Sequence, residues 1–368
     1  MSKPVAVLLY PGFQELEFWY PVLRLREARR EVVVLGTAGQ DAAYSRLGYP
    51  VVPNRAVAGA SGADFAAVVI PGGNTGALGH DPVLRAFLDE AAQAGALLAA
   101  VSEGRSLLGK AVDGAITAAS TDDLPAWGHR LMSALDATSS LALPREARIA
   151  ILAENQYQEL ELWHPLLRLR EAGAHVLVVG PARDQVYASK LGYPVRPDLA
   201  VADVTAGDFD AVVIPGGFAP EGMRRHKAMI DFVRDMDARG NLVAAICHAG
   251  WVLASAGIAK DRDVTCVALI RDDVIHAGGR YRDEAVVRDR NLITSRLPSD
   301  LHLFCGAILD YLRDAPAASP AGRRLAPADG RAPASAVHAQ RAVLGMGPRG
   351  IASADYTTVV NLGETVVR

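Results

Sequence analysis

The sequence predicts two doubly wound α/β domains with parallel sheets in one chain, and two observations carry this prediction. A long segment is repeated at a constant spacing, and each copy alternates short apolar runs with amphipathic segments of helical period. A fixed repeat indicates that one structural unit occurs twice. Short apolar strands that alternate with helices are typical of a parallel sheet with helices on both faces.

The repeat is clearest in two pairs of segments. Residues 15–28 read ELEFWYPVLRLREA, and residues 159–172 read ELELWHPLLRLREA, 144 positions later. The same spacing relates DFAAVVIPGG at residues 64–73 to DFDAVVIPGG at residues 208–217. We therefore predict a tandem duplication whose two copies share one architecture.

The elements of each copy follow from the apolar pattern. Strands are predicted at residues 5–10, 32–36, 66–70 and 97–101, and again at 149–153, 176–180, 211–214, 242–246 and 292–296. Helices are predicted to begin at the two ELE segments, and Pro165 is expected to bend the second of them. The last helices are predicted at residues 124–135 and 300–312. Ligands of such sheets bind beyond the carboxyl ends of the strands, where both PGG segments fall.

The domain boundaries follow from the repeat and from composition. Residues 1–145 and 146–313 are predicted as two domains that pack as a pseudo-dimer, and residues 314–368 as a tail. Residues 315–333 are rich in Ala, Pro, Gly and Arg, which is typical of a disordered linker. Residues 356–367 have the pattern of a short strand or hairpin.

Composition and charge limit the classes of binding partner and the cellular location that we expect. The net charge of −3 gives no basic excess for nucleic acid or an anionic membrane. The first apolar run is too short for a signal peptide, and no run reaches a membrane span. The three cysteines, Cys247, Cys266 and Cys305, show no metal-ligand spacing. We expect a cytoplasmic protein with reduced thiols and a small-molecule substrate. Within residues 1–313 the sequence has no GxGxxG or Walker-type loop, so no cofactor is expected.

Cys247 is the predicted nucleophile. It follows the apolar run at residues 242–246 and opens a helix, so its side chain should project from the carboxyl edge of the sheet. The helix dipole and nearby N–H groups should favour the thiolate. The alternative is a small buried hydrophobic residue, which is our interpretation of Cys266 and Cys305. In the first copy the corresponding pair is Ser102-Glu103.

The remaining site residues are predicted around Cys247. The N–H groups of His248 and Gly217 are candidates for an oxyanion hole, with Gly216 and Ala249 as further candidates for substrate contact. A surface histidine and a tight glycine turn are the plainer alternatives. Glu161 begins its helix at the same sheet edge, where a partly buried carboxyl with a raised pKa would shuttle protons. Glu159 should face elsewhere. Glu17 repeats Glu161 in the first copy, where its role is lost or structural.

The second copy resembles the ThiJ/PfpI (DJ-one-like) superfamily over residues 148–312. The resemblance is carried by ELELWHP, LGYPV, AVVIPGG, AICHAG, IRDDVI and NLITSR. It implies a flavodoxin-like domain related to class I glutamine amidotransferases, with a nucleophile-elbow cysteine. It maps the nucleophile to Cys247, its neighbour to His248 and the family's acid to Glu161, with oxyanion amides at Gly217 and His248. The first copy matches from residue 5 to residue 70 and then diverges.

Three departures from the family pattern bear on function. Val267 stands where PfpI-like members often have Tyr. Glu221 matches an acid that a neighbouring subunit can supply in oligomeric members, and the first copy has Ala77 there. A homodimer could therefore bring Glu221 to another chain's Cys247. Ser102-Glu103 makes the first copy a non-catalytic scaffold.

The leading hypothesis is a glyoxalase-like enzyme that converts a small reactive carbonyl to a hydroxy acid. Such an enzyme would be a lyase or hydrolase that needs no cofactor, and we expect it to act in stress response. A second is a hydratase, lyase or cyclase for a biosynthetic intermediate, similar to isonitrile hydratases. A PfpI-like peptidase or deglycase is a third, and a non-enzymatic redox sensor that oxidises Cys247 to a sulfinate is a fourth.

Overall fold

The computed structural model describes residues 2–39, 41–109, 113–136, 142–144, 146–314, 325 and 360–361. The chain divides into two compact units, with the first boundary between Ser139 and Ser140. Within the described residues, no helix has both the length and the apolar character that a membrane crossing needs. The predicted linker and hairpin of the tail lie outside the described residues, except Leu325 and the short strand β20 (Val360–Asn361), which pairs with β4.

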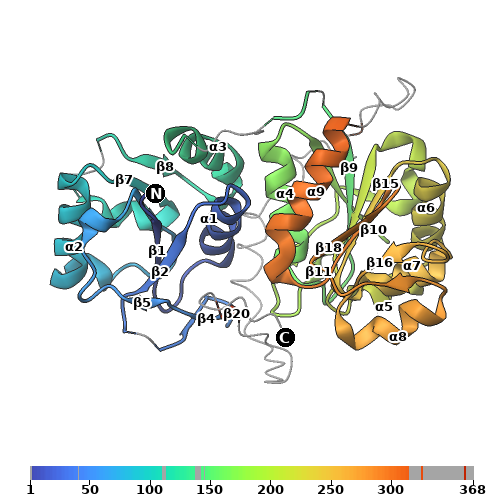
Figure 1. The fold of residues 1–368 in the computed structure, drawn as a ribbon, viewed down its shortest axis with the longest axis horizontal. Coiled ribbons are helices and arrows are strands. Elements are labelled where there is room, and N and C mark those ends of the chain that lie inside the picture. The colour runs from blue at the N-terminus through green and yellow to red at the C-terminus, as the bar shows by residue number, and fades with distance from the viewer. Residues whose placement is uncertain are drawn as a thin grey trace. The chain divides into compact units, whose positions relative to one another are not determined.

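The first unit is built on a six-stranded parallel sheet of order β5-β2-β1-β6-β7-β8. Its strands are β1 (Val5–Leu9), β2 (Val32–Gly36), β5 (Arg55–Ala56), β6 (Ala67–Ile70), β7 (Leu97–Val101) and β8 (Ile116–Ala118). Helices α1 (Glu15–Glu27) and α3 (Leu124–Ala134) cover one face, and α2 (Pro82–Gln93) covers the other (Figure 1). The pair β3 (Ala43–Tyr44) and β4 (Pro50–Val52) lies outside this sheet.

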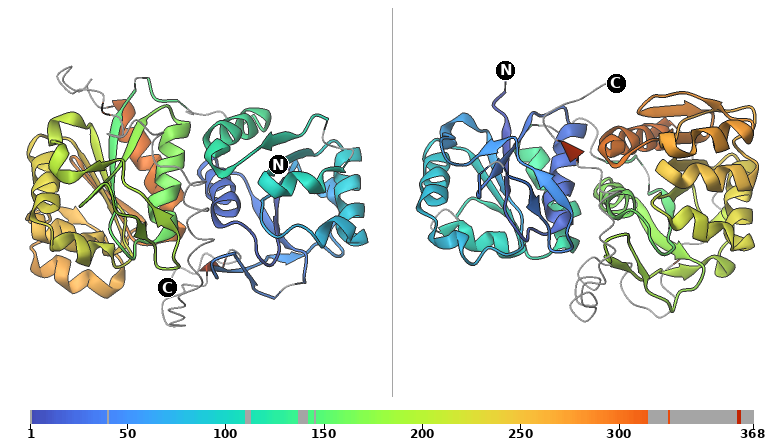
Figure 2. Two further views of the ribbon diagram at one scale, coloured as in Figure 1. Left: turned by 180° about the vertical axis from the view of Figure 1, so that it is seen from behind. Right: turned by 90° about the horizontal axis from the view of Figure 1, so that it is seen from below.

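The second unit has a seven-stranded sheet of order β13-β10-β9-β14-β15-β19-β18. Its strands are β9 (Arg148–Leu152), β10 (His175–Gly180), β13 (Leu199–Ala200), β14 (Ala211–Ile214), β15 (Leu242–Ile246), β18 (Val286–Asp289) and β19 (Leu292–Ser295). Helices α4 (Glu159–Glu171) and α9 (Leu301–Asp314) lie on one face, and α5 (Ala219–Arg224), α6 (Lys227–Ala238) and α7 (Gly250–Ala256) on the other (Figures 1 and 2). Both units are therefore doubly wound α/β domains, as the sequence predicts.

The central strands coincide with the predicted ones because they are buried on both faces and must be apolar throughout. Every residue of β1, β6, β14 and β15 is buried. Cys266 and Cys305 are also buried, in agreement with their prediction as core residues. Helix α4 continues past Pro165 to Glu171, and the bend expected there stays a prediction.

The extra stretch of the second copy adds structure beside the sheet edge. It supplies β16 (Asp263–Val264), α8 (Arg271–His276), β17 (Arg280–Tyr281) and the edge strand β18, which is antiparallel to β19. The N–H of Val267 donates to the carbonyl oxygen of Cys247 at 3.4 Å. The stretch therefore forms a wall next to the predicted nucleophile, and the first copy has no counterpart for it.

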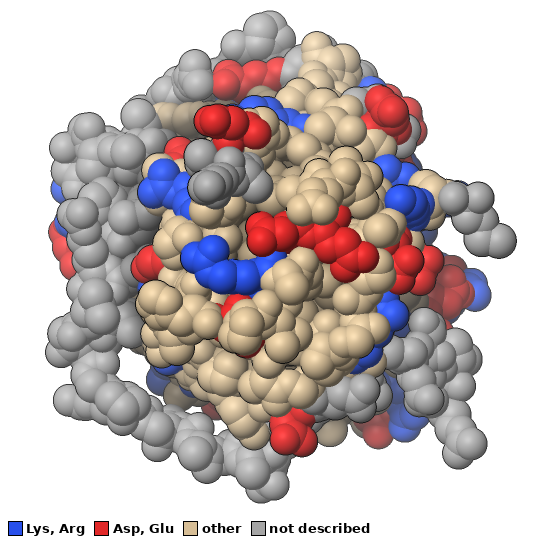
Figure 3. Space-filling view, turned by 90° about the vertical axis from the view of Figure 1, so that its left-hand side faces the viewer, with Lys and Arg blue, Asp and Glu red and all other residues tan. Residues whose placement is uncertain are grey.

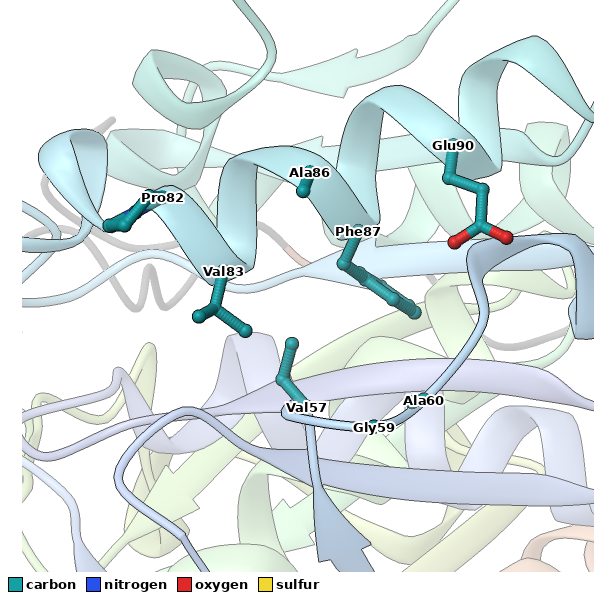
Figure 4. A pocket seen from close by; sticks show the side chains of 8 residues that line it. All are labelled: Val57, Gly59, Ala60, Pro82, Val83, Ala86, Phe87 and Glu90. Carbon is teal, nitrogen blue, oxygen red and sulfur yellow. The ribbon is translucent and has the colours of Figure 1, made fainter.

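Two surface features of the chain lie apart from the predicted site. A cavity of about 370 Å³ opens in the first unit between α2 and the loop after β5 (Figure 4). It is lined by Val57, Gly59, Ala60, Pro82, Val83, Ala86, Phe87 and Glu90. On the face drawn in Figure 3, acidic and basic side chains are interspersed among uncharged ones, in keeping with the small net charge.

Candidate active site

A strained turn at the end of β15 presents Cys247. The backbone of Cys247 has φ of 61°, in the left-handed region, and a 3-10 turn, Cys247–Ala249, leads from it into α7. A non-glycine residue pays of order 1–3 kcal/mol for such a conformation, which persists where the surroundings impose it. The turn projects the side chain from the carboxyl edge of the sheet, as in a nucleophile elbow. Cys247 is buried, with 8% of its surface exposed.

Glu161 is held against this elbow by its place in α4. The side chain of Gln158 caps the helix by accepting the N–H of Glu161 at 2.9 Å, which fixes Glu161 in the first turn. Its Oε2 accepts the N–H of Gly216 at 2.8 Å. Its Oε1 is buried and accepts no hydrogen bond from the described residues. Burial raises the pKa of Glu161 to about 8, although the N–H of Gly216 and the thiol of Cys247 act in the opposite direction.

The thiol of Cys247 and the carboxyl of Glu161 form one coupled acid pair. Burial, followed by the negative charge of Glu161, raises the pKa of Cys247 well above its usual value, while the N–H groups of Gly217 and His248 lower it. The amides favour the thiolate, as expected, but burial outweighs them, so the net pKa of the thiol is raised. Because both pKa values are raised above neutral pH, both groups hold their protons there, and loss of the first proton gives a single negative charge that the pair shares.

His248 lies closer to the thiol than its adjacency in sequence suggested. Its Nδ1 is 3.3 Å from Sγ of Cys247. The imidazole lies between two aromatic rings, with centroids 6.0 Å from Phe218 and 5.2 Å from Trp251. Burial lowers the pKa of His248 to about 4, and the positive charge of Lys190 adds to this effect. The ring is therefore neutral at physiological pH and can accept a hydrogen bond from the thiol or orient a water molecule.

The two glycines after β14, Gly216 and Gly217, make different contacts. Gly217 has φ of 74°, and its N–H points to the thiol together with that of His248. Gly216 instead donates to Glu161, and a Cβ there would lie 2.6 Å from Cβ of Cys247 and 2.7 Å from Oε2 of Glu161. Gly216 thus allows acid and thiol to meet, whereas Gly217 and His248 have the geometry of an oxyanion hole.

Other predicted residues lie at the margin of the site. Ala249 ends the 3-10 turn and is fully buried. Glu221 is an exposed residue of α5, and its role as an acid supplied to another chain stays a prediction, like the pseudo-dimer and the homodimer. Glu159 faces away, as expected, and accepts hydrogen bonds from the hydroxyl of Ser189 at 2.5 Å and the N–H of Leu191 at 2.7 Å.

The first copy keeps the elbow but closes it with its own side chains. Ser102 has φ of 46°, and its hydroxyl donates to Oε1 of Glu17 at 2.6 Å. Thr121 donates to the same oxygen at 2.8 Å, and the N–H of Gly72 donates to Oε2 at 2.7 Å. Pro298 occupies the position of Thr121 in the second copy, so Glu161 has no second hydroxyl there. Both oxygens of Glu17 therefore accept hydrogen bonds, whereas Oε1 of Glu161 has no hydrogen-bond partner among the described residues.

Three residues near the thiol were not singled out from the sequence: Lys190, Phe218 and Trp251. Lys190 stands in the loop that precedes LGYPV, and its charge affects His248 and Glu161. Phe218 directly follows Pro-Gly-Gly, and Trp251 lies three residues after His248, one helical turn away. The helical spacing was the available signal for Trp251. Among the described residues, no group of three or more His, Cys, Asp or Glu side chains is placed to hold a metal ion.

The fold and this site define a doubly wound α/β protein with an elbow cysteine, a buried glutamate beside it and two amides aimed at the sulfur. The chain belongs to the DJ-1/PfpI family, whose model matches residues 3–121 and 147–311. Each copy therefore contributes one family domain.

Curated relatives match a single domain's length of this chain. An uncharacterised protein of Archaeoglobus fulgidus is 46% identical over 166 residues, which cover 45% of this chain and 98% of that protein. The protein named Deglycase PfpI of Pyrococcus furiosus is 38% identical, with 45% and 99% covered. The putative cysteine protease YraA of Bacillus subtilis is 36% identical, with 45% and 98% covered.

Two solved structures are similar to part of the chain. A two-domain protein of Anabaena variabilis, with DJ-1/ThiJ/PfpI-like and ferritin-like domains, is 37% identical with a TM-score of 0.45, covering 48% of this chain and 52% of that one. DJ-1beta of Drosophila melanogaster is 29% identical with a TM-score of 0.44, covering 46% and 92%.

Glu161→Gln is expected to make the thiol of Cys247 reactive at lower pH. Removal of the carboxylate charge lowers the pKa of Cys247, so alkylation of this thiol by iodoacetamide should reach half its maximal rate at a lower pH than in the wild type. Alkylation is followed by peptide mass spectrometry across pH 5–10. Glu17→Gln in the first copy is the matched control and should leave the profile unchanged. An unaltered profile in Glu161→Gln would show that the two groups are not coupled.

Gly216→Ala is expected to abolish chemistry because its Cβ would push the thiol and the acid apart. Turnover of whichever substrate the enzyme accepts should fall by at least about 100-fold. Gly72→Ala introduces a similar clash in the first copy, with contacts of 2.3 Å to Oε2 of Glu17 and 2.8 Å to Cβ of Ser102. It should cost about 1–3 kcal/mol of unfolding free energy and leave turnover intact. Equal turnover in the two variants would contradict this assignment.

Proposed function

We propose that the second copy is a cofactor-independent enzyme that converts a small 2-oxoaldehyde, such as methylglyoxal, to the corresponding 2-hydroxy acid. The observation that carries the proposal is the contact between a nucleophilic sulfur and a buried carboxyl whose pKa is raised to about 8. Isomerisation of an aldehyde adduct requires one group that takes a proton from carbon and returns it to the next carbon. Glu161, with Oε1 available and a pKa near neutral, is suited to both steps.

The proposed reaction balances without an external oxidant. The sulfur of Cys247 adds to the aldehyde carbon, and the N–H groups of Gly217 and His248 stabilise the oxyanion of the adduct. Glu161 passes its proton to this oxyanion and becomes a carboxylate. It then removes the proton from the first carbon and delivers a proton to the neighbouring ketone carbon, so the first carbon is oxidised to a thioester while the second is reduced to an alcohol. Water cleaves the thioester, which restores the thiol and releases the hydroxy acid. The neutral imidazole of His248 orients that water.

A deglycase activity is the second candidate, and the names of several relatives favour it. The same sulfur would attack the carbonyl adduct of an amine or a thiol. The two activities differ in what they consume. With a methylglyoxal adduct of N-acetyl-lysine, the rate of a deglycase follows the adduct concentration, whereas the rate of a glyoxalase follows the concentration of free aldehyde.

Cys247→Ala is the direct test of the proposed function. Its rate of lactate formation from methylglyoxal should fall at least about 1,000-fold, since no other described thiol lies at the elbow. Ser102→Ala, the same truncation at the elbow of the first copy, should retain the wild-type rate. Lactate is quantified by an enzyme-coupled assay with purified full-length chain. Wild-type rates in Cys247→Ala, or no turnover in the wild-type protein, would overturn the proposal.

A further inference from the structure

The tryptophan beside His248 is held by an acid from the extra stretch of the second copy. Nε1 of Trp251 donates a hydrogen bond to Oδ2 of Asp273 at 2.9 Å. Trp251 belongs to α7, the helix that follows the elbow, whereas Asp273 belongs to α8 and to the IRDDVI segment. The indole ring cannot turn away without losing a hydrogen bond to a carboxylate, so this contact fixes its orientation.

The packing of α8 on α7 makes that contact rigid. A Cβ at Gly250 would lie 2.8 Å from Cγ2 of Val274 and 3.0 Å from Cδ1 of Ile270. Both of these side chains are buried. Gly250 directly precedes Trp251, and Val274 directly follows Asp273. The close approach that glycine permits therefore lies next to the hydrogen bond and sets the distance between the two helices.

The indole ring in turn packs against the imidazole of His248. The two ring centroids are 5.2 Å apart, and the ring planes are inclined by 59°. Nδ1 of the same imidazole is 3.3 Å from Sγ of Cys247. A continuous series of contacts therefore leads from the carboxylate of Asp273 through Trp251 and His248 to the sulfur.

The first copy has the elbow but none of these three side chains. Four positions after the elbow residue it has Ser106, where the second copy has Trp251. The hydroxyl of Ser106 donates to the carbonyl oxygen of Glu103, the residue that replaces His248, at 2.7 Å. The sequence of the first copy also has no counterpart of residues 264–290, which include Asp273. The same α/β architecture thus forms without the three side chains, and they accompany the thiol.

We propose that Asp273 and Trp251 are positioning residues that hold the imidazole of His248 against the thiol of Cys247. A neutral imidazole carries its proton on either nitrogen. When the thiol ionises, its proton passes to Nδ1 while the proton on Nε2 leaves to water. The half-buried ring stays neutral, and its new N–H donates to the thiolate. The inference rests on the proposed function for the reaction that this thiolate begins.

The test is the pH profile of Cys247 alkylation by iodoacetamide in the full-length chain, followed by peptide mass spectrometry. Asp273→Leu removes the acceptor that holds Trp251, so the pH of half-maximal alkylation should rise by about one unit, the size of a hydrogen bond to a charged group. The midpoint is compared because a change in access scales the rate equally at every pH. Trp251→Phe, which removes only the donor N–H and the larger ring, should also raise the midpoint.

The charge of Asp273 has the opposite effect, which makes the sign of the shift informative. Burial and then the negative charge of Asp273 raise the pKa of Cys266 to about 12. Loss of this charge alone would therefore lower the pKa of a nearby thiol. Asp273→Asn removes the charge but keeps an acceptor oxygen, so its midpoint should not rise. Asp272→Leu, at the exposed acid next to it in α8, is the matched control and should leave the profile unchanged.

A double variant shows whether the effect passes through His248. His248→Ala keeps the backbone N–H, and in this background Asp273→Leu should cause no further shift. An unchanged or lower midpoint in Asp273→Leu, or a rise that persists without the imidazole, would overturn the inference even if methylglyoxal is turned over. A rise that requires His248, in a chain that does not convert methylglyoxal, would uphold the positioning role and remove the proposed function instead.

Discussion

The left-handed backbone at the residue after the central strand is the constraint on which the site depends. Both copies adopt it, with φ of 61° at Cys247 and 46° at Ser102. The turn sends the side chain towards the first turn of the helix after the first strand, where a glutamate is held by a glutamine cap in each copy. Close approach then requires a glycine, Gly216 or Gly72, between the two groups. The first copy keeps this strained arrangement although it has no thiol, because Glu17 binds Ser102 there instead.

The two copies form an internal comparison of one site in two chemical states. In the first, every oxygen of Glu17 is bound, and Glu103 neutralises Arg46 across the amide of Gly73. Side chains thus complete a hydrogen-bond network that stabilises the fold. In the second, proline in place of Thr121, cysteine in place of serine and histidine in place of glutamate open this network at three points. The differences lie where a substrate would need room and a proton acceptor.

The sequence predicted the scaffold well for a physical reason. Strands buried on both faces must be apolar along their whole length, and the predicted 32–36, 97–101, 211–214 and 242–246 match β2, β7, β14 and β15 residue for residue. The position of Glu161 beside Cys247 also followed, because parallel strands end at one edge. The bridge between Glu103 and Arg46 could not be predicted, since 57 residues separate them and neither belongs to a periodic pattern. The sequence indicated the effect of the amides on the thiol pKa but not the larger effect of burial, because burial is a property of the packed site and not of the residues next to Cys247.

Charge conservation explains how a thiol with a raised pKa can still be a nucleophile. Two negative charges cannot be accommodated in a buried elbow, so ionisation of the sulfur requires that Glu161 hold the proton. That protonated acid, with a pKa near 8, lies beside the thiolate it stabilises. When sulfur attacks a carbonyl, the single negative charge moves from sulfur to the new oxygen, towards the N–H groups of Gly217 and His248. The total charge in the elbow stays constant during the attack, so the free-energy cost of a buried charge is already present in the thiolate state. The amides then lower the barrier for moving this charge from sulfur to oxygen. In the first copy the corresponding amide of Gly73 already holds a carboxylate oxygen, so no substrate charge could be received there even if Ser102 were ionised.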